Sequence, residues 1–191
     1  MLNFEDIIVG CLQNRNNCKE MIYKSFYGYL MAVILRYVRE RDDAEELVND
    51  TFIKIFNAMG QFKLPKKKEE NQKAFKAWIS TIASRTAIDF LRTKKDFVSI
   101  DEVVEEQEPL TEVNIVTALN VKDILKLLDA LPEMQKLIFN LYEIEGFSHD
   151  EIAKTLNIPE SSSRVYLTRA KNKLRALYSK LIENSYATYG T

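Results

Sequence analysis

Basic side chains gather near the end of the chain, on a segment with helical periodicity. Residues 160–181 hold six Lys or Arg residues against one Glu, and the apolar residues among them recur every three or four positions, as along one buried side of a helix. Arg164, near the start of this helix, could form two hydrogen bonds with the edge of a guanine base. Lys171 and Lys173 suit contacts with phosphates. This pattern favours contact with duplex DNA, and a solvated amphipathic helix is the alternative.

The residues before this basic helix favour the same function. Ser148 to Glu151 match the S-x-x-E capping box that begins a helix, and a turn at residues 157–160 follows. A short helix, a tight turn and a second helix are the order of a helix-turn-helix. At about 100° per residue, the side of the second helix opposite its apolar seam carries Ser162, Val165, Tyr166, Arg169, Asn172 and Lys173. These side chains are the candidates for contact with DNA.

An acidic surface is predicted on residues 43–59, whose apolar side chains recur at helical spacing. Residues 40–50 hold six Asp or Glu residues and a single base. Ile53 lies on the polar side of this helix, beside Glu46 and Asp50. One exposed isoleucine is ordinary on a protein surface, but one flanked by acids resembles a contact patch for a basic protein partner. Both interpretations of Ile53 stay open at the level of the sequence.

A basic row is predicted on the helix of residues 73–93, opposite an apolar stripe that includes Trp78. The row consists of Thr81, Arg85, Ile88 and Arg92. Such a row could follow a phosphate backbone, with an aromatic side chain to support an unpaired base. Trp78 taken alone is more simply a core residue. Together with the lysine-rich residues 63–68, however, the row favours a nucleic acid over a merely solvated face.

Composition excludes several classes of protein. The chain has 191 residues with only five Gly and four Pro, which disfavours turn-rich β folds. Two cysteines, Cys11 and Cys18, and one histidine, His149, are too few for a disulfide scaffold, a zinc site or a catalytic triad, and there is no Gly-rich phosphate loop. We therefore expect no enzymatic activity, no cofactor and no metal. The cysteines are interpreted as ordinary helix thiols, and His149 as a helix-end residue without a function.

The sequence also bears on the cellular location of the protein, through the lengths of its hydrophobic segments. No apolar run approaches the roughly 20 residues that span a bilayer. The first six residues also lack the basic region of a signal peptide. We therefore expect a cytoplasmic protein without membrane insertion.

The pattern as a whole predicts an all-α protein made of two small helical domains joined by a flexible acidic linker. Residues 96–112 hold seven acids and no base and show no sustained periodicity. We place the two domains at residues 1–95 and 118–184, the linker at 96–117 and a tail at 185–191.

Three segments of the chain resemble bacterial RNA polymerase sigma factors of the extracytoplasmic-function (ECF) group. Residues 43–56, DAEELVNDTFIKIF, look like the helix of region 2 that binds polymerase, and residues 74–92, AFKAWISTIASRTAIDFLR, resemble the promoter-melting helix that follows it. Residues 131–175, which include SHDEIAKTLNIPE, are similar to region 4. The segments occur in the order of the family and cover nearly the whole chain outside the linker.

This resemblance implies a protein that binds core RNA polymerase, through the β′ clamp helices and the β subunit, and directs it to particular promoters. The residues at the polymerase-binding motif are Asp43, Glu46, Leu47, Asp50, Phe52, Ile53 and Phe56. Those implied to meet the −10 element are Lys76, Trp78, Thr81, Arg85, Ile88 and Arg92. Those implied to read the −35 element are Ser162, Ser163, Arg164, Val165, Tyr166, Arg169 and Lys173. An anti-sigma factor is a further partner that many members of the group have.

Two other functions stay open. A stand-alone helix-turn-helix regulator would bind duplex DNA without polymerase, but it leaves residues 43–56 and the melting helix unexplained. A purely protein-binding helical module, such as an inactive sigma-like decoy, would bind polymerase and give no transcript from any promoter.

Overall fold

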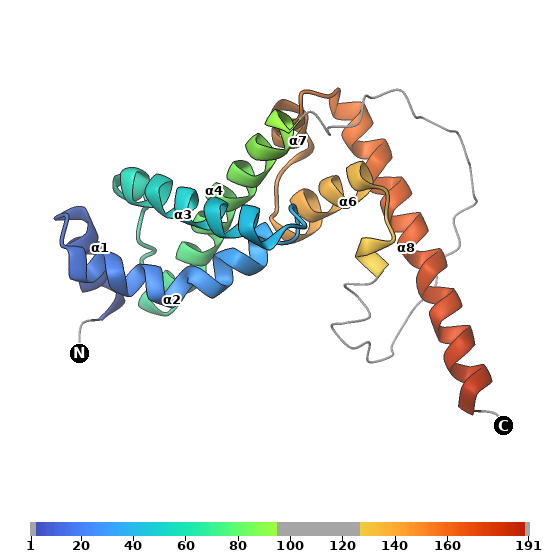
Figure 1. Cartoon of the computed structure of the whole chain (residues 1–191), viewed down its shortest axis with the longest axis horizontal. Helices are drawn as coiled ribbons and strands as arrows, with labels where there is room; N and C mark the ends of the chain where they lie inside the picture. Colours follow the sequence, from blue (N-terminus) through green and yellow to red (C-terminus); the bar gives the residue numbers. More distant parts are fainter. Residues whose placement is uncertain (1–2, 95–126, 190–191) are drawn as a thin grey trace. The chain divides into compact units, whose positions relative to one another are not determined.

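The chain divides into two compact units, Met1–Phe97 and Val98–Thr191. The computed structural model describes residues 3–94 and 127–189, with side chains as far as Leu181. All secondary structure in these residues is helical (Figure 1), so the predicted all-α class is confirmed. The predicted acidic linker at residues 96–117 lies outside the described residues. No helix among those described is long and apolar enough to cross a membrane.

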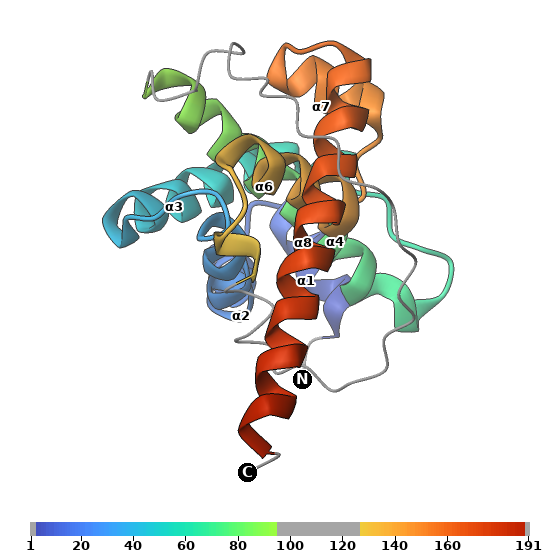
Figure 2. The same ribbon diagram turned by 90° about the vertical axis from the view of Figure 1, so that its right-hand side faces the viewer.

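The first unit contains four α-helices: α1 (Phe4–Leu12), α2 (Asn16–Ile34), α3 (Arg41–Ala58) and α4 (Asn71–Thr93). Two 3-10 turns, η1 (Met59–Gln61) and η2 (Lys68–Glu70), lie in the connection between α3 and α4. In Figure 2 this connection, coloured teal to green, curves away from the helices. The sequence predicted one or two helices before residue 39 and two more after it, and all of these are present.

Apolar residues at helical spacing build the core of the first unit. Each of α2, α3 and α4 buries a row of side chains, and among the largest that are fully buried are Ile22, Leu30, Ile34, Ile55, Phe75, Ile79 and Ile88. Around Phe75 the rings of Phe4, Phe26 and Phe62 approach edge-on, with centroid distances of 5.4, 5.1 and 5.1 Å. Edge-to-face pairs of this kind add to the free energy gained by burying apolar area. They tie α1 and the α3–α4 connection to α4.

The two cysteines take part in the tight packing of α1 on α2. A side chain at Gly10 would place its Cβ only 2.2 Å from the sulfur of Cys18, so glycine is required for the two helices to approach. Burial, and then the neighbouring Cys18, raises the pKa of Cys11 to about 11. The thiol of Cys11 is therefore protonated at neutral pH, as befits a packing residue.

The second unit contains α6 (Glu133–Phe139), the π-helical turn η3 (Asn140–Ile144), α7 (His149–Leu156) and α8 (Glu160–Tyr189). Leu128 and Leu131 pack with Ala170 in its core. The predicted helix after Pro132 is present, but its last turn widens into η3, which spacing did not predict. α8 also runs five residues beyond the predicted end of the domain at residue 184, so the tail proposed at 185–191 is largely helical.

Local chemistry fixes the corner between α7 and α8. Ser148 and Glu151 form the predicted capping box at the start of α7, each side chain accepting a bond from the backbone of the other residue. Asn157 ends α7 in the left-handed conformation, at φ 55°, and α8 begins three residues later. The short capped helix, tight turn and long helix of a helix-turn-helix are thus confirmed.

Candidate functional site

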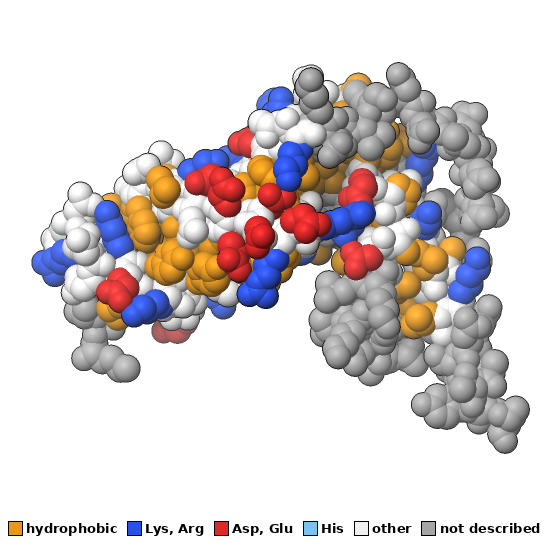
Figure 3. Space-filling view, in the orientation of Figure 1, with side chains coloured by type: hydrophobic (Ala, Val, Ile, Leu, Met, Phe, Trp, Pro, Cys, Tyr) orange, Lys and Arg blue, Asp and Glu red, His pale blue; other side chains and the backbone are white. Residues whose placement is uncertain are grey.

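The outer face of α3 combines one exposed apolar side chain with several acids. Ile53 is 60% exposed, and Glu46 and Asp50 are exposed on the same helix. Figure 3 shows the acidic side chains of this region next to apolar ones. Leu47 and Phe52, which the resemblance placed in the contact set, are buried in the core instead. They support the helix from within and cannot touch a partner unless the bundle opens.

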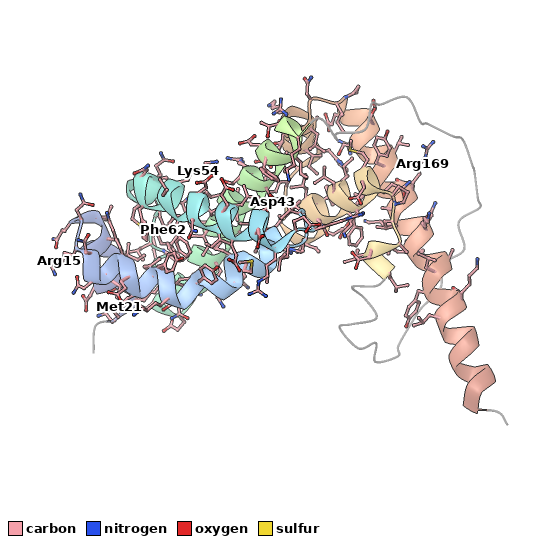
Figure 4. All side chains as sticks on the ribbon, in the orientation of Figure 1. Arg15, Met21, Asp43, Lys54, Phe62 and Arg169 are labelled. Atoms are coloured by element: carbon pink, nitrogen blue, oxygen red, sulfur yellow. The ribbon has the colours of Figure 1, made fainter. Side chains whose placement is uncertain are left out.

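Two further members of the α3 set have partners within the first unit. Asp43 forms an ion pair with Lys94 at the end of α4, with 2.6 Å between the ammonium nitrogen and a carboxylate oxygen. The ammonium of Lys94 also lies over the ring of Phe90. Figure 4 labels Asp43 at the N-terminal end of α3. Phe56 is half-buried, stacked on Phe52 and covered by the ammonium of Lys19 at 5.6 Å. Ile53, Glu46 and Asp50 therefore form the accessible part of the set, which we call the α3 face.

An exposed row on α4 carries both basic and aromatic residues. Trp78, Thr81, Arg85 and Arg92 fall within about 60° of one another around the helix at 100° per residue. Trp78 therefore lies on the same side of α4 as the basic residues, and the prediction that it lies opposite them is wrong. Arg85 and Arg92 are exposed, and Trp78 and Thr81 are half-exposed. We call these four residues the α4 row. The indole of Trp78 packs against Phe62 and Phe75, with centroids at 5.3 and 5.7 Å, which leaves one part of the ring accessible and holds the rest in place.

Two residues predicted for this surface lie elsewhere. Ile88 is fully buried, although it falls only about 20° from Thr81 around the helix. Lys76 is nine positions before Arg85, which is about half a turn around the helix. Its ammonium lies 5.5 Å from the ring of Tyr29 on α2. The side chain of Lys76 is exposed, but on the opposite side of α4 from Arg85.

The outward side of α8 brings together five of the seven residues predicted for the second DNA contact. Ser162, Val165, Tyr166, Arg169 and Lys173 fall within an arc of about 100°. We call them the α8 strip. All five are at least partly exposed, and Val165 is 46% exposed. Figure 4 shows Arg169 on the side of α8 turned away from α6.

The other two residues lie off this strip. Ser163 is fully buried, and its hydroxyl oxygen is 2.9 Å from Nδ1 of His149. Arg164 is exposed on the flank of α8, where it is paired with Glu160 one turn earlier. Ser163 is therefore in no position to touch DNA, and Arg164 can do so only by exchanging Glu160 for a phosphate or a base.

Lys171, which suited a phosphate contact on spacing alone, is also engaged within the second unit. Its ammonium lies 2.6 Å from a carboxylate oxygen of Glu143 and 5.9 Å from the ring of Tyr142. Both partners belong to η3. Lys171 therefore attaches α8 to η3 rather than projecting from the α8 strip. Within the described parts of the two units, no group of three His, Cys, Asp or Glu side chains could hold a metal ion.

Two family models match the chain, and they match in the order that the resemblance implied. Sigma-70 region 2 matches residues 22–97 and Sigma-70, region 4 matches residues 122–174. The chain belongs to the sigma-70 family of RNA polymerase sigma factors. As a sigma factor, it binds core RNA polymerase and promoter DNA and directs transcription initiation. α7 and the first half of α8 lie within the region 4 match, and α3 and α4 lie within the region 2 match.

Curated relatives of this sigma factor include members of the ECF group. It is 25% identical over 164 residues to the ECF RNA polymerase sigma factor SigX of Bacillus subtilis, covering 82% of this chain and 81% of the relative. It is 27% identical over 158 residues to the RNA polymerase sigma factor SigZ of the same organism, covering 83% and 85%. The solved sigma factor RpoE of Bartonella quintana, in complex with the anti-sigma factor NepR, matches 84% of this chain and 96% of its own with a TM-score of 0.49 and 22% identity.

Sequence reasoning missed two residues that shape these surfaces of the sigma factor. Phe62 follows η1 and orients Trp78, and an aromatic residue before the lysine-rich segment was the only signal of it. His149 was expected at a helix end without a function, and it is instead buried against Ser163. A histidine within a capping box gives no sign in the sequence that its ring turns inward, because that depends on the helix that packs over it.

Proposed function

We propose that the α3 face, the α4 row and the α8 strip of this sigma factor each bind a different target. The α3 face binds the β′ clamp helices of core polymerase, the α4 row contacts the −10 element, and the α8 strip reads the −35 element. The first two surfaces belong to the predicted domain at residues 1–95 and the third to the domain at 118–184. The proposal also takes the protein to act in the cytoplasm and to catalyse no reaction of its own.

One observation carries the polymerase contact, namely that Ile53 is 60% exposed between exposed acids. Neither Glu46 nor Asp50 has an ion-pair partner in the described parts of the chain. An apolar centre with a charged rim is the composition of a protein interface, and the negative rim calls for a basic partner surface. A stand-alone regulator, which binds DNA without polymerase, would not need such a protein-binding face.

The α4 row fits a strand that has left the duplex. Arg85 and Arg92 can pair with phosphates, and the accessible part of Trp78 offers a face for an unstacked base. Unstacking costs a few kcal/mol, which polymerase contacts and the base contact together would offset. The row would therefore act at the −10 element, where the strands separate.

The α8 strip fits the major groove of duplex DNA. Arg169 can bond a guanine with two hydrogen bonds, Val165 can pack on a thymine methyl group, and Lys173 can reach a phosphate. The capped α7 would cross the backbone beside it, as the first helix of such motifs does. An anti-sigma factor stays a prediction that rests on the family resemblance.

In vitro transcription with bacterial core polymerase on a pooled promoter library tests the proposed function. With this protein present we expect new transcripts whose promoters share two spaced upstream elements. Binding of core polymerase without any new transcript would instead favour a decoy. Neither transcripts nor core binding, together with tight binding to duplex DNA, would favour a stand-alone regulator.

The lysine-rich connection between α3 and α4 offers a second measurement on the −10 contact. Lys63 and Lys66 of this connection and Lys73 in the first turn of α4 are exposed, and no hydrogen bond or ion pair joins them to another described residue. Changing all three to Gln is expected to lower the slope of log affinity against log salt by about 2, since each phosphate of a single strand contributes about 0.7. Holoenzyme binding to a promoter with an opened −10 region, measured at several salt concentrations, gives this slope. Lys24→Gln on α2, also exposed, is the matched control, and an equal slope in all three proteins would exclude the contact.

A further inference from the structure

His149 is a buried titratable side chain that no surface described so far uses. It is the single histidine of the chain and begins α7, where only 9% of it is exposed. Its ring stacks on that of Tyr142, with centroids 4.4 Å apart and planes inclined by 25°. Its Nδ1 lies 2.9 Å from the hydroxyl oxygen of Ser163. The imidazole is therefore held from two sides by groups from two other elements.

These contacts join η3, α7 and the first turn of α8, next to the α8 strip. Tyr142 comes from η3, His149 from α7 and Ser163 from the first turn of α8. Ser163 is flanked in the sequence by Ser162 and is two positions before Val165, both on the α8 strip. Because a helix is rigid over a few turns, fixing Ser163 toward α7 fixes the direction in which the strip points.

A second attachment lies two turns further along α8. Lys171 is eight positions after Ser163 and pairs with Glu143 of η3 at 2.6 Å, next to Tyr142. The widened turn η3 thus contacts α8 directly through Glu143 and indirectly through Tyr142 and His149. Two attachments on one side of a helix restrain its rotation about its own axis, which a single contact does not.

We propose that His149 is a positioning residue for −35 recognition, whose neutral imidazole holds the α8 strip in the orientation that reads DNA and whose protonation releases it. The proposal rests on the proposed function of the α8 strip. The neutral ring can accept a hydrogen bond at Nδ1 from the Ser163 hydroxyl. A protonated ring can only donate there, so the Ser163 oxygen would have to accept instead. The release therefore comes from the charge, which is placed in a buried site beside Arg164 and Lys171.

The charged groups around the ring oppose its protonation. Arg164 and Lys171 of α8 are positive, and Glu160 of α8, whose negative charge favours protonation, is already paired with Arg164. Tyr142 of η3 contributes a neutral ring. Burial, and then Arg164, lowers the pKa of His149 below its ordinary value. Since the folded state prefers the neutral form, its stability is complete above the ordinary histidine pKa and falls as the pH drops below it.

The test compares holoenzyme on two DNAs at several pH values. The DNAs are a promoter obtained from the pooled library and the same promoter with its −35 element scrambled, and the measured quantity is the ratio of their dissociation constants. Core polymerase and the −10 element contribute equally to both, so the ratio isolates −35 recognition. Measurements extend from about pH 8 to about pH 5, because the pKa of His149 lies below the ordinary histidine value of about 6.5.

The variants separate the bond from the charge. For the wild type we expect the ratio to fall about threefold to tenfold between the highest and the lowest pH, the effect of losing about one hydrogen bond. His149→Asn, whose side-chain amide lies where Nδ1 does and can bond Ser163 but does not titrate, should keep a constant ratio. His149→Phe, which keeps the stacking but not the bond, should show the lowered ratio at every pH, as should Ser163→Ala.

Two results would overturn the proposal. One is a ratio for His149→Asn that falls with pH as the wild type's does. The other is a lower melting temperature for His149→Phe with an unchanged ratio under conditions where the variant is folded, which would make the contact merely structural. If the wild type fails to distinguish the two DNAs even at high pH, the −35 function of the strip is wrong and the proposal fails with it. That result differs from both others, because they leave the wild-type ratio intact at high pH.

Discussion

Replacing Ile53 with aspartate is expected to weaken binding of core polymerase by about 1–3 kcal/mol, roughly fivefold to 150-fold, without unfolding the protein. The side chain is 60% exposed, so the first unit loses little packing when it is changed. In the complex, by contrast, the isoleucine would be covered, and an aspartate in its place would lose its water without gaining a partner. Titration of labelled core polymerase gives the affinity, and thermal unfolding gives the stability.

A matched variant separates this contact from a general effect of adding charge. Val9 on α1 is 45% exposed, and Val9→Asp makes the same kind of change on another helix of the same unit. We expect Val9→Asp to leave core binding within about twofold of the wild type, because surface changes away from an interface usually have effects below 0.5 kcal/mol. Equal losses of affinity in the two variants would contradict a specific contact at Ile53. A large fall in melting temperature for Ile53→Asp alone would show that Ile53 belongs to the core.

The elements of this protein were predictable because each one is specified by residues close together in the sequence. Ser148 and Glu151 mark the start of α7 by a bond between neighbours, and the recurrence of apolar residues marks α3, α4 and α8. The widened turn η3 was not predicted, since its apolar residues follow the same spacing as an α-helix. Glu143 of η3 pairs with Lys171 of α8, a contact between elements that local spacing does not encode.

The site residues were harder to predict, because the spacing of a helix tells which side chains share a side but not which sides are covered. Leu47 and Phe52 match the contact motif of the family and are nevertheless buried. Ser163 is covered because His149, fourteen positions earlier, folds back over it. Such a contact depends on the angle between α7 and α8, and no local pattern in the sequence encodes that angle.

Ile88 and Arg85 show that residues on the same side of a helix can differ in burial, since helical spacing placed both in one row. Ile88 is fully buried, so Ile88→Ala is expected to lower the free energy of unfolding by about 2–5 kcal/mol through lost apolar contact and the cavity left behind. In a unit of this size that corresponds to a fall in melting temperature of roughly 10 °C or more. Thermal unfolding of the variant measures it. At a temperature where the variant is folded, open-complex formation by its holoenzyme should be close to that of the wild type.

Arg85→Gln is expected to behave in the opposite way. Arg85 is exposed, so its loss should change the free energy of unfolding by about 0.5 kcal/mol or less. Open-complex formation at the −10 element should slow by about tenfold, the scale of one charged hydrogen bond to a phosphate. Permanganate reactivity of unpaired thymines follows the opening directly in both variants. Unchanged stability with slow opening in Ile88→Ala would instead place Ile88 against DNA. The bundle would then have to expose that side of α4 when polymerase binds, because the free protein covers it.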